Sequence, residues 1–272
     1  MANVQTGPAQ YLTRFGEQTI SGNQYALAKL GIDRATCSLK IEEYLILCVP
    51  FQLGFKRSIF MASLSRQELA FFQKYQNGIV GLSISLNPSK RPEPVKFFLR
   101  CTLSNIGQMK GQENVGLFVV DYKTSPDEMV SMLGSFMEAQ ERMRMQYEDF
   151  GRTPVRMTPD VSRTMGYNLY ATLTQPNIPP RRIQLLSLST KSMEYVEAAG
   201  SPVLIPSISA AYQLFFKKFR VNVNGRVKTS EALPQGIVRS VATLEFCPEL
   251  VEIMDEYWYN NYRVNSPQKP NR

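Results

Sequence analysis

The chain has 272 residues, of which 43% are hydrophobic and 11% aromatic, and it carries a formal net charge of +8. A disordered chain would contain fewer apolar residues, so this length predicts two globular domains of ordinary size. The sequence contains no histidine, which excludes a Ser-His-Asp triad, a Cys-His pair, a histidine general base and zinc sites with histidine ligands.

The basic residues are concentrated in the second half of the chain. Residues 1–150 have a net charge of +2 and residues 151–272 a net charge of +6, which favours an anionic partner. The four cysteines form no CxxC pair, and we expect them to be buried and reduced. We see neither a signal peptide nor an apolar run of membrane-spanning length, and therefore expect a cytoplasmic protein. Without a Walker loop or a GxGxxG motif we expect neither a cofactor nor enzymatic activity.

The first half is predicted to form a β domain over residues 37–150. Residues 1–36 are interpreted as an N-terminal extension, either a flexible arm or one short helix. Beyond them, β-type runs alternate with turn residues, and one helix is predicted after the capping box of Ser65 and Glu68. The five predicted strands are 39–49, 58–63, 79–86, 95–103 and 115–122. Their short loops predict a small barrel or sandwich.

A long helix is predicted over residues 125–150, with Ser125 as its N-cap, Pro126 at the first helical position and Glu128 closing a capping box. Its apolar residues at helical spacing are Met129, Leu133, Phe136, Met143 and Tyr147. We interpret them as a stripe that packs on the first domain. The alternative is an adaptable, methionine-rich binding face.

Residues 151–260 are predicted to form a second β domain. Its predicted strands are 167–173, 183–188, 203–208, 213–223, 226–229 and 240–246. Asn224 and Gly225 form the strongest hairpin signal, because a type I′ turn needs positive φ at both central residues. A last helix is predicted after Pro248, and residues 261–272 are predicted to be a flexible tail.

Arg152 and Arg156 stand four residues apart directly after the long helix, with Pro154 between them. The proline keeps this stretch extended or in a turn, so both guanidinium groups can address phosphates or stack on bases. Taken alone, the pair is equally compatible with a solvated turn.

The elements that follow the two arginines resemble a PilZ domain. An RxxxR motif, one strand, a strand ending in LLSLSTKSM, a hairpin with VNGRV, a strand ending in VATLEF and a short helix occur in this order. Residues 37–150 resemble the PilZ-like N-terminal domain of two-domain PilZ proteins of spirochaetes. The resemblance implies a mainly β fold of two small β-barrels, the PilZ-like N-terminal barrel and the PilZ barrel, joined by an α-helix and ending in a short C-terminal helix. The resemblance also implies that the protein is a receptor for cyclic di-GMP.

PilZ domains bind cyclic di-GMP through RxxxR and a later D/N-x-S-x-x-G, and Arg152 and Arg156 match the first motif. The second aligns with Ser187, Ser189 and Ser192, so only Ser189 keeps the family's residue type. Ser187 replaces an Asp or Asn that bonds a guanine edge, which lowers binding by about 1–3 kcal/mol. Ser192 replaces a glycine, which costs about 1 kcal/mol where a positive φ is needed. The candidates for compensating phosphate contacts are Arg163, Arg181 and Arg182.

Three functions fit these observations. The first is a cyclic di-GMP receptor in which binding orders residues 152–156 and changes the relative placement of the two barrels. The second is a PilZ scaffold that binds no nucleotide and acts on a protein partner in motility or the cell envelope, which an exposed apolar patch between Met129 and Met145 would favour. The third is nucleic-acid binding, indicated by a pI of about 9.3 and the aromatic and basic cluster at 212–220. We do not expect a nucleic-acid partner, because strand alternation buries half of those aromatics.

Overall fold

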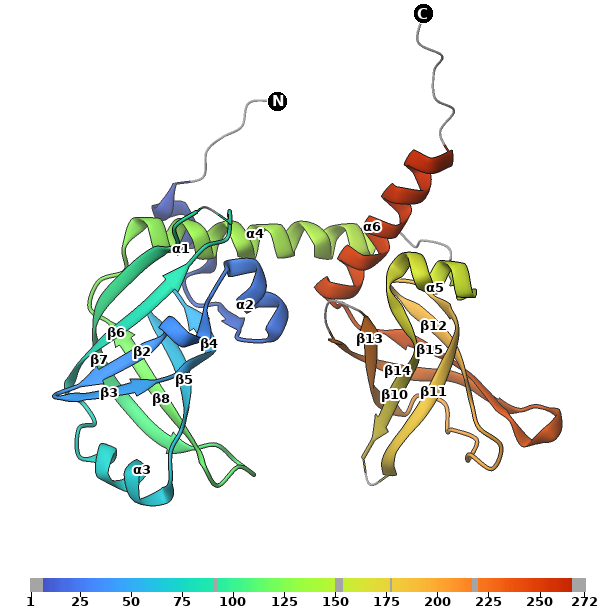
Figure 1. Cartoon of the computed structure of the whole chain (residues 1–272), viewed down its shortest axis with the longest axis horizontal. Helices are drawn as coiled ribbons and strands as arrows, with labels where there is room; N and C mark the ends of the chain where they lie inside the picture. The colour runs from blue at the N-terminus through green and yellow to red at the C-terminus, as the bar shows by residue number, and fades with distance from the viewer. Residues whose placement is uncertain (1–6, 91, 150–153, 177, 217–219, 266–272) are drawn as a thin grey trace, which may run out of the picture. The chain divides into compact units, whose positions relative to one another are not determined.

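The structure is a computed structural model that describes residues 7–90, 92–149, 154–176, 178–216 and 220–265. It divides between Ala139 and Gln140 into two compact units, each with its own hydrophobic core. Both units are built mainly of antiparallel strands (Figure 1), which confirms the predicted mainly β fold. All four cysteines are buried and free. None of the described helices is long and apolar enough to cross a membrane.

The N-terminal unit contains one eight-stranded sheet. Its strands are β1 (Thr19–Ser21), β2 (Ser38–Ile41), β3 (Tyr44–Leu47), β4 (Val49–Gly54), β5 (Arg57–Ser63), β6 (Ile79–Leu86), β7 (Val95–Gln108) and β8 (Val115–Tyr122). Neighbouring strands follow the order β1-β4-β5-β8-β7-β6-β2-β3, so the edges among the described residues are β1 and β3. In β7, the buried Phe97 and Leu99 alternate with the exposed Phe98 and Arg100. Because burial alternates from one residue to the next, the curved sheet has one face toward the core and one toward solvent.

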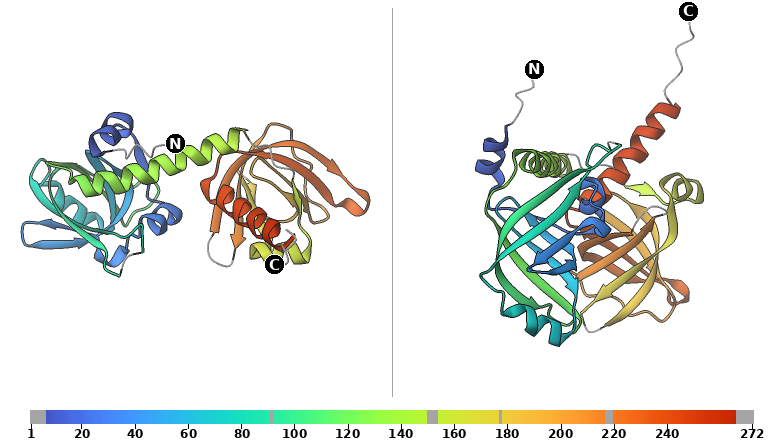
Figure 2. Two further views of the ribbon diagram at one scale, coloured as in Figure 1. Left: turned by 90° about the horizontal axis from the view of Figure 1, so that it is seen from above. Right: turned by 60° about the vertical axis from the view of Figure 1, so that its left-hand side comes forward.

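Residues 7–36, which the sequence suggested as part of an N-terminal extension, pack into this unit. They form α1 (Pro8–Phe15), β1, α2 (Gln24–Leu30) and a 3-10 turn at Arg34–Thr36. The segment's buried apolar side chains are Tyr11, Phe15, Ile20, Ala26, Leu27, Leu30 and Ile32. α1 lies beside the first half of α4 (Asp127–Asp149; Figures 1 and 2), where the Tyr11 hydroxyl is 3.3 Å from the Ser135 hydroxyl.

Two helices follow the predicted pattern closely. α3 (Arg66–Gln73) has the full capping box, in which the Ser65 hydroxyl accepts from the Glu68 N–H and the Glu68 carboxylate accepts from the Ser65 N–H. α4 begins at Asp127, one residue after the predicted first helical position at Pro126. The Ser125 hydroxyl donates to the Phe55 carbonyl instead of capping the helix.

The apolar stripe of α4 is a core stripe over its first half, as predicted. Met129, Leu133 and Met137 are buried in the N-terminal core. The second half of α4 belongs to the C-terminal unit, where the Tyr147 hydroxyl donates to the Leu244 carbonyl at 2.6 Å. An exposed apolar patch between Met129 and Met145, which would favour a protein partner, is therefore not found in this core half, although Met145 is exposed.

The C-terminal unit is a six-stranded closed barrel with one short added strand. Its elements are β9 (Val155–Arg156), α5 (Pro159–Met165), β10 (Tyr167–Gln175), β11 (Ile178–Leu188), β12 (Ser192–Glu197), β13 (Ser209–Phe216), β14 (Arg220–Ala232), a 3-10 turn (Pro234–Gly236), β15 (Val238–Leu244) and α6 (Pro248–Asn265). The order β10-β13-β14-β15-β12-β11 closes because β10 also pairs with β11, and β9 is added beside β11. A closed sheet leaves no free edge among its own six strands.

Several features of this unit differ from what the sequence predicts. Residues 203–208 form a loop, because Pro202 and Pro206 flank a stretch in which Ser207 has a φ of 68°. The strand β12 and the helix α5 were not predicted. α6 extends to Asn265, into the segment expected to be a flexible tail.

Asn224 and Gly225 do not form a turn but lie within β14, which was predicted as two strands. Gly225 is paired with Ala210 on one side and Leu244 on the other. A Cβ at Gly225 would clash with the carbonyl oxygen of Thr243. A glycine is therefore needed here because the neighbouring strand approaches too closely for a side chain, which is a common reason for glycine within a strand.

We expect Gly225→Ala to lower the free energy of unfolding by about 1–3 kcal/mol, because the added methyl forces neighbouring strands apart. Urea denaturation measures the change. Gly81→Ala is the matched control, since a Cβ there meets only the Lys40 Cβ at 3.7 Å. Equal stability losses in the two variants would contradict the close-approach explanation.

Candidate ligand-binding site

The predicted site residues Arg156 and Ser187 lie directly opposite one another on adjacent strands. β9 pairs with β11 so that Arg156 faces Ser187, and Ser187 in turn is opposite Glu194 on β12. Arg156 is exposed and the other two are partly exposed, whereas the adjacent Val155 is buried. Strand alternation therefore places Arg156, Ser187 and Glu194 in one row on the outer surface of the barrel. Arg152 lies outside the described residues.

A β-bulge lies next to Ser187. The register between β11 and β12 shifts between Leu185 and Ser187, and the Leu186 carbonyl accepts from the Met157 N–H at 2.8 Å. A bulge changes the direction in which the following side chains point and is frequent at binding sites. The hydrogen bond between Met157 and Leu186 at this bulge also attaches the segment with Arg156 to the barrel.

Ser189 shapes the turn between β11 and β12. Its buried hydroxyl accepts from the backbone N–H groups of Lys191 at 3.2 Å and Ser192 at 2.9 Å, and it donates to the Ser192 carbonyl at 3.1 Å. These three bonds use the one donor and two acceptors that a hydroxyl has. Ser189 therefore holds Ser192 in place and has no further bond to offer a ligand.

Ser192 occupies the glycine position of the motif without backbone strain. It begins β12 and is not among the residues with positive φ. The cost that a left-handed conformation would impose on a serine is thus absent here. Its hydroxyl lies 3.0 Å from that of Ser189, whose hydrogen bonds are already made within the turn.

Charged residues not singled out in the sequence surround this row. The Glu194 carboxylate lies 2.5 Å from the Arg239 guanidinium and accepts from the Ser187 hydroxyl at 3.4 Å. The Lys191 ammonium donates to the Glu148 carbonyl at 2.9 Å, near the end of α4, where the helix dipole favours a cation. Arg226 is in register with Thr243, which pairs with Ser192. Polar and apolar residues alternate over residues 192–195, and this alternation could have predicted that Glu194 lies on the outer face.

The three arginines predicted to compensate each interact with another residue of the C-terminal unit. Arg163 is exposed on α5 and forms an ion pair with Asp160 at 3.4 Å. Arg182 lies over the Tyr170 ring at 4.5 Å, and lines a depression of about 580 Å³ five residues before Ser187. That separation corresponds to about 16 Å along a strand.

Arg181 is directed away from the outer surface. Its side chain is 17% exposed and that of its ion-pair partner Glu197 is 1% exposed, with 3.0 Å between their charged atoms. Arg181 also donates to the Gln175 side chain at 2.8 Å. Burial raises the pKa of Glu197, and Arg181 opposes the shift. This pair is a structural element of the barrel.

The aromatic and basic cluster at 212–220 does not form a continuous surface in the described residues. Tyr212 and Phe216 are buried. Phe215 packs on Tyr170, with Arg220 over its ring at 5.5 Å. Residues 217–219 lie outside the described part of the chain.

The outer surface of the closed barrel thus presents an arginine, hydroxyls and further cations, which are groups that can donate hydrogen bonds to an anion. Residues 9–140 match the PilZN3 domain. Over these residues the chain is similar to PilZN3 domains, which agrees with the resemblance of the first domain seen in the sequence.

Solved structures of PilZ proteins are similar over most of the chain. PlzA of Borreliella burgdorferi in complex with c-di-GMP has 12% identity and a TM-score of 0.47, covering 92% of this chain and 97% of that chain. YcgR of Escherichia coli in complex with c-di-GMP has 10% identity and a TM-score of 0.31, covering 95% and 92%. The inhibitor of motility MotI of Bacillus subtilis has 9% identity and a TM-score of 0.32, covering 87% and 100%. No curated protein matches the sequence.

Proposed function

We propose that this protein is a PilZ-type adaptor without enzymatic activity that binds cyclic di-GMP on the outer surface of its C-terminal barrel. The observation that carries the proposal is the register of β9 against β11, which places Arg156 directly opposite Ser187. The two halves of the family's binding motif, 31 residues apart in sequence, are thereby adjacent in space. Neither half would form a site alone.

The residues of this row suit the two chemical parts of a cyclic dinucleotide. Arg152 and Arg156 supply guanidinium groups for the phosphates and for stacking on guanine. The Watson–Crick edge of guanine presents N–H donors, which need an acceptor. Ser187 offers only a hydroxyl, but the Glu194 carboxylate on the next strand is within 3.4 Å of it. We propose that Glu194 provides the carboxylate that the motif has lost at Ser187.

Ligand binding would act on the connection between the two domains. The segment with Arg152 and Arg156 directly follows α4, and Lys191 holds the end of that helix through the Glu148 carbonyl. A ligand that engages both arginines would change how the two domains are placed. A partner protein would then meet an altered surface.

Isothermal titration calorimetry with cyclic di-GMP tests the proposal, with cyclic di-AMP and GMP as controls. We expect saturable binding of cyclic di-GMP and much weaker binding of the other two. Absence of binding at micromolar protein with excess cyclic di-GMP would overturn the proposed ligand. The PilZ scaffold that acts only through a protein partner would then be the remaining function.

We expect Ser187→Asn to bind cyclic di-GMP roughly tenfold more tightly than the natural protein, because an amide adds a hydrogen bond worth about 1.4 kcal/mol at a guanine edge. Ser187→Asp should gain less, since its carboxylate would face that of Glu194 across adjacent strands. Titration of both variants measures the difference. If Ser187→Asp bound cyclic di-GMP more tightly than Ser187→Asn, Glu194 would not be the hydrogen-bond acceptor for guanine.

A further inference from the structure

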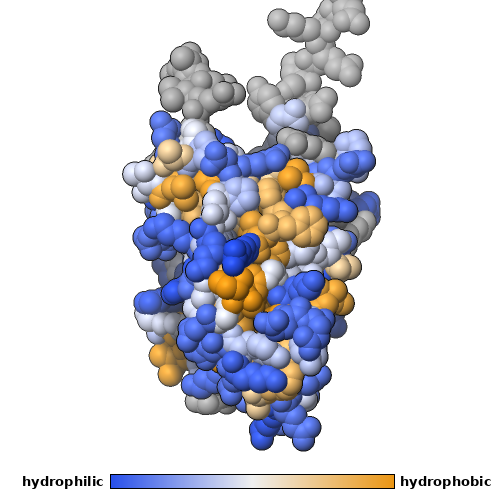
Figure 3. Space-filling model, turned by 90° about the vertical axis from the view of Figure 1, so that its left-hand side faces the viewer, coloured by the Kyte–Doolittle hydropathy of each residue, from blue (hydrophilic) through white to orange (hydrophobic). Residues whose placement is uncertain are grey.

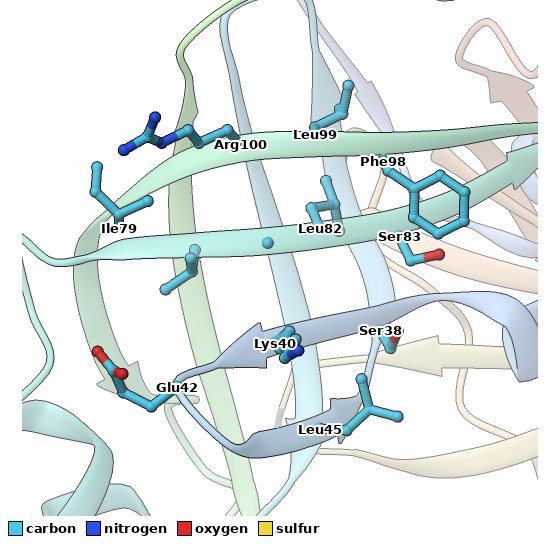
Figure 4. A pocket seen from close by; sticks show the side chains of 12 residues that line it. Ser38, Lys40, Glu42, Leu45, Ile79, Leu82, Ser83, Phe98, Leu99 and Arg100 are labelled. Atoms are coloured by element: carbon cyan, nitrogen blue, oxygen red, sulfur yellow. The ribbon is translucent and has the colours of Figure 1, made fainter.

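The solvent face of the N-terminal sheet carries a groove of about 610 Å³ (Figure 4). β2 and β6 form its floor, and β3 and β7 stand on either side. Gly81 lies between Lys40 on β2 and Arg100 on β7, with Leu45 of β3 completing that row. Since Gly81 has no side chain, the middle of the floor is hollow.

The rims of the groove are apolar and exposed. Leu45 and Leu47 on β3 are 66% and 64% exposed, and Phe98 on β7 is 79% exposed. Ile79 closes one end. Apolar side chains also gather between hydrophilic ones on the face of this unit seen in Figure 3. Contiguous exposed apolar residues rimmed by polar ones mark an interaction site.

Two cations lie across the middle of this apolar surface. Lys40 and Arg100 occupy the same row, and within the described part of the chain neither forms an ion pair or side-chain hydrogen bond. Both are exposed. Glu42 is the acidic residue of the lining and lies toward the Ile79 end (Figure 4). The groove thus has a net positive charge, so an acidic occupant would complement it.

The dimensions of the groove fit an α-helix. Its rims, β3 and β7, are three strand spacings apart, or about 14 Å, and a helix with its side chains is about 10–12 Å wide. The floor from the Ser83 row to the Ile79 row covers about 13 Å, which corresponds to roughly two and a half helical turns. A helix of that length presents apolar residues at i, i+3, i+4 and i+7 to a groove.

We propose that this groove is the docking site for an amphipathic helix of a partner protein, with an apolar face between the rims and acidic residues toward Lys40 and Arg100. A second copy of this chain is a poorer occupant, because it would bring the same two cations against each other. The proposal concerns the N-terminal domain and does not depend on dinucleotide binding. The partner of a PilZ-type adaptor would then carry an acidic amphipathic helix.

Fluorescence polarisation with two labelled, hydrocarbon-stapled helical peptides tests the proposal on the full chain. Both peptides carry the same Leu and Phe face, flanked by Glu in one and by Lys in the other. We expect the Glu peptide to bind at least about tenfold more tightly than the Lys peptide. In the double variant Lys40→Glu/Arg100→Glu this preference should reverse. Equal binding of the two peptides would overturn the proposal.

Two further variants separate the groove from general charge effects. Gly81→Val fills the floor, and because its Cβ meets only Lys40 at 3.7 Å it should fold normally while weakening the Glu peptide about tenfold. Lys110→Glu changes the charge on an exposed turn outside the groove and should leave binding unchanged. Unaltered affinity in Gly81→Val would contradict the proposed site. A dimer seen by sedimentation velocity that Gly81→Val dissociates would instead identify a second copy as the occupant.

Discussion

Arg156→Ala is expected to weaken cyclic di-GMP binding roughly ten- to a hundredfold, since a charge-assisted hydrogen bond contributes about 1.5–3 kcal/mol. The folded state should be unaffected. The Arg156 side chain is exposed and forms no ion pair among the described residues, so its removal leaves no buried group without a partner. Titration calorimetry measures the affinity, and thermal melting without ligand measures the stability.

Two variants make this prediction specific to the site. Arg156→Lys keeps the charge but loses the two-pronged guanidinium geometry, so its affinity should fall between those of the natural protein and Arg156→Ala. Arg100→Ala removes one exposed arginine from the N-terminal domain and should bind cyclic di-GMP normally. Binding by Arg156→Ala at the affinity of Arg100→Ala would place the ligand elsewhere.

The correctly predicted parts of the fold are those that depend on residues close together in the sequence. β6 and β8 have the predicted bounds, and the capping box at Ser65 is present, because alternation and caps depend on neighbours in sequence. Asn224 and Gly225 show the opposite case. A local turn signal was overridden by Thr243, a residue on another strand that needs the space a side chain would fill. The role of α1 was missed for the same reason, since Tyr11 packs beside α4, far away in sequence.

The sequence singled out Arg156 and Ser187, which the structure brings together, but it could not predict the directions of the other candidate side chains. The spacing of Arg156 and Ser187 carries the family pattern, and the structure places the two opposite each other. The direction of Arg181 depends on which face of β11 it occupies, and the neighbouring Arg182 points the other way. Two adjacent arginines on a strand cannot both face the ligand. Glu194 was missed because β12 was not recognised as a strand.

Arg181→Met should lower the free energy of unfolding by about 3–5 kcal/mol, the usual effect of removing one partner from a buried ion pair. The variant leaves the 1% exposed Glu197 side chain without its cation. Arg239→Met is the control on an exposed pair with Glu194 and should cost less than about 1 kcal/mol. Urea denaturation measures both. Because Arg181 is directed away from the outer surface, the folded variant should still bind cyclic di-GMP, whereas a ligand role for Arg181 would weaken binding.

The destabilisation by Arg181→Met should depend on pH. Burial already raises the pKa of Glu197 above 4.5, and Arg181 is the group that opposes this shift. Without Arg181 the folded-state pKa rises further, so the folded variant takes up a proton more readily than the unfolded chain. Its stability relative to the natural protein is therefore highest below pH 4.5 and falls as pH rises through the folded-state pKa. The double variant Arg181→Met/Glu197→Leu removes both charges and should regain most of the lost stability without this pH dependence. A double variant as unstable as the single one, or a loss that does not change with pH, would show that the ion pair is not the cause.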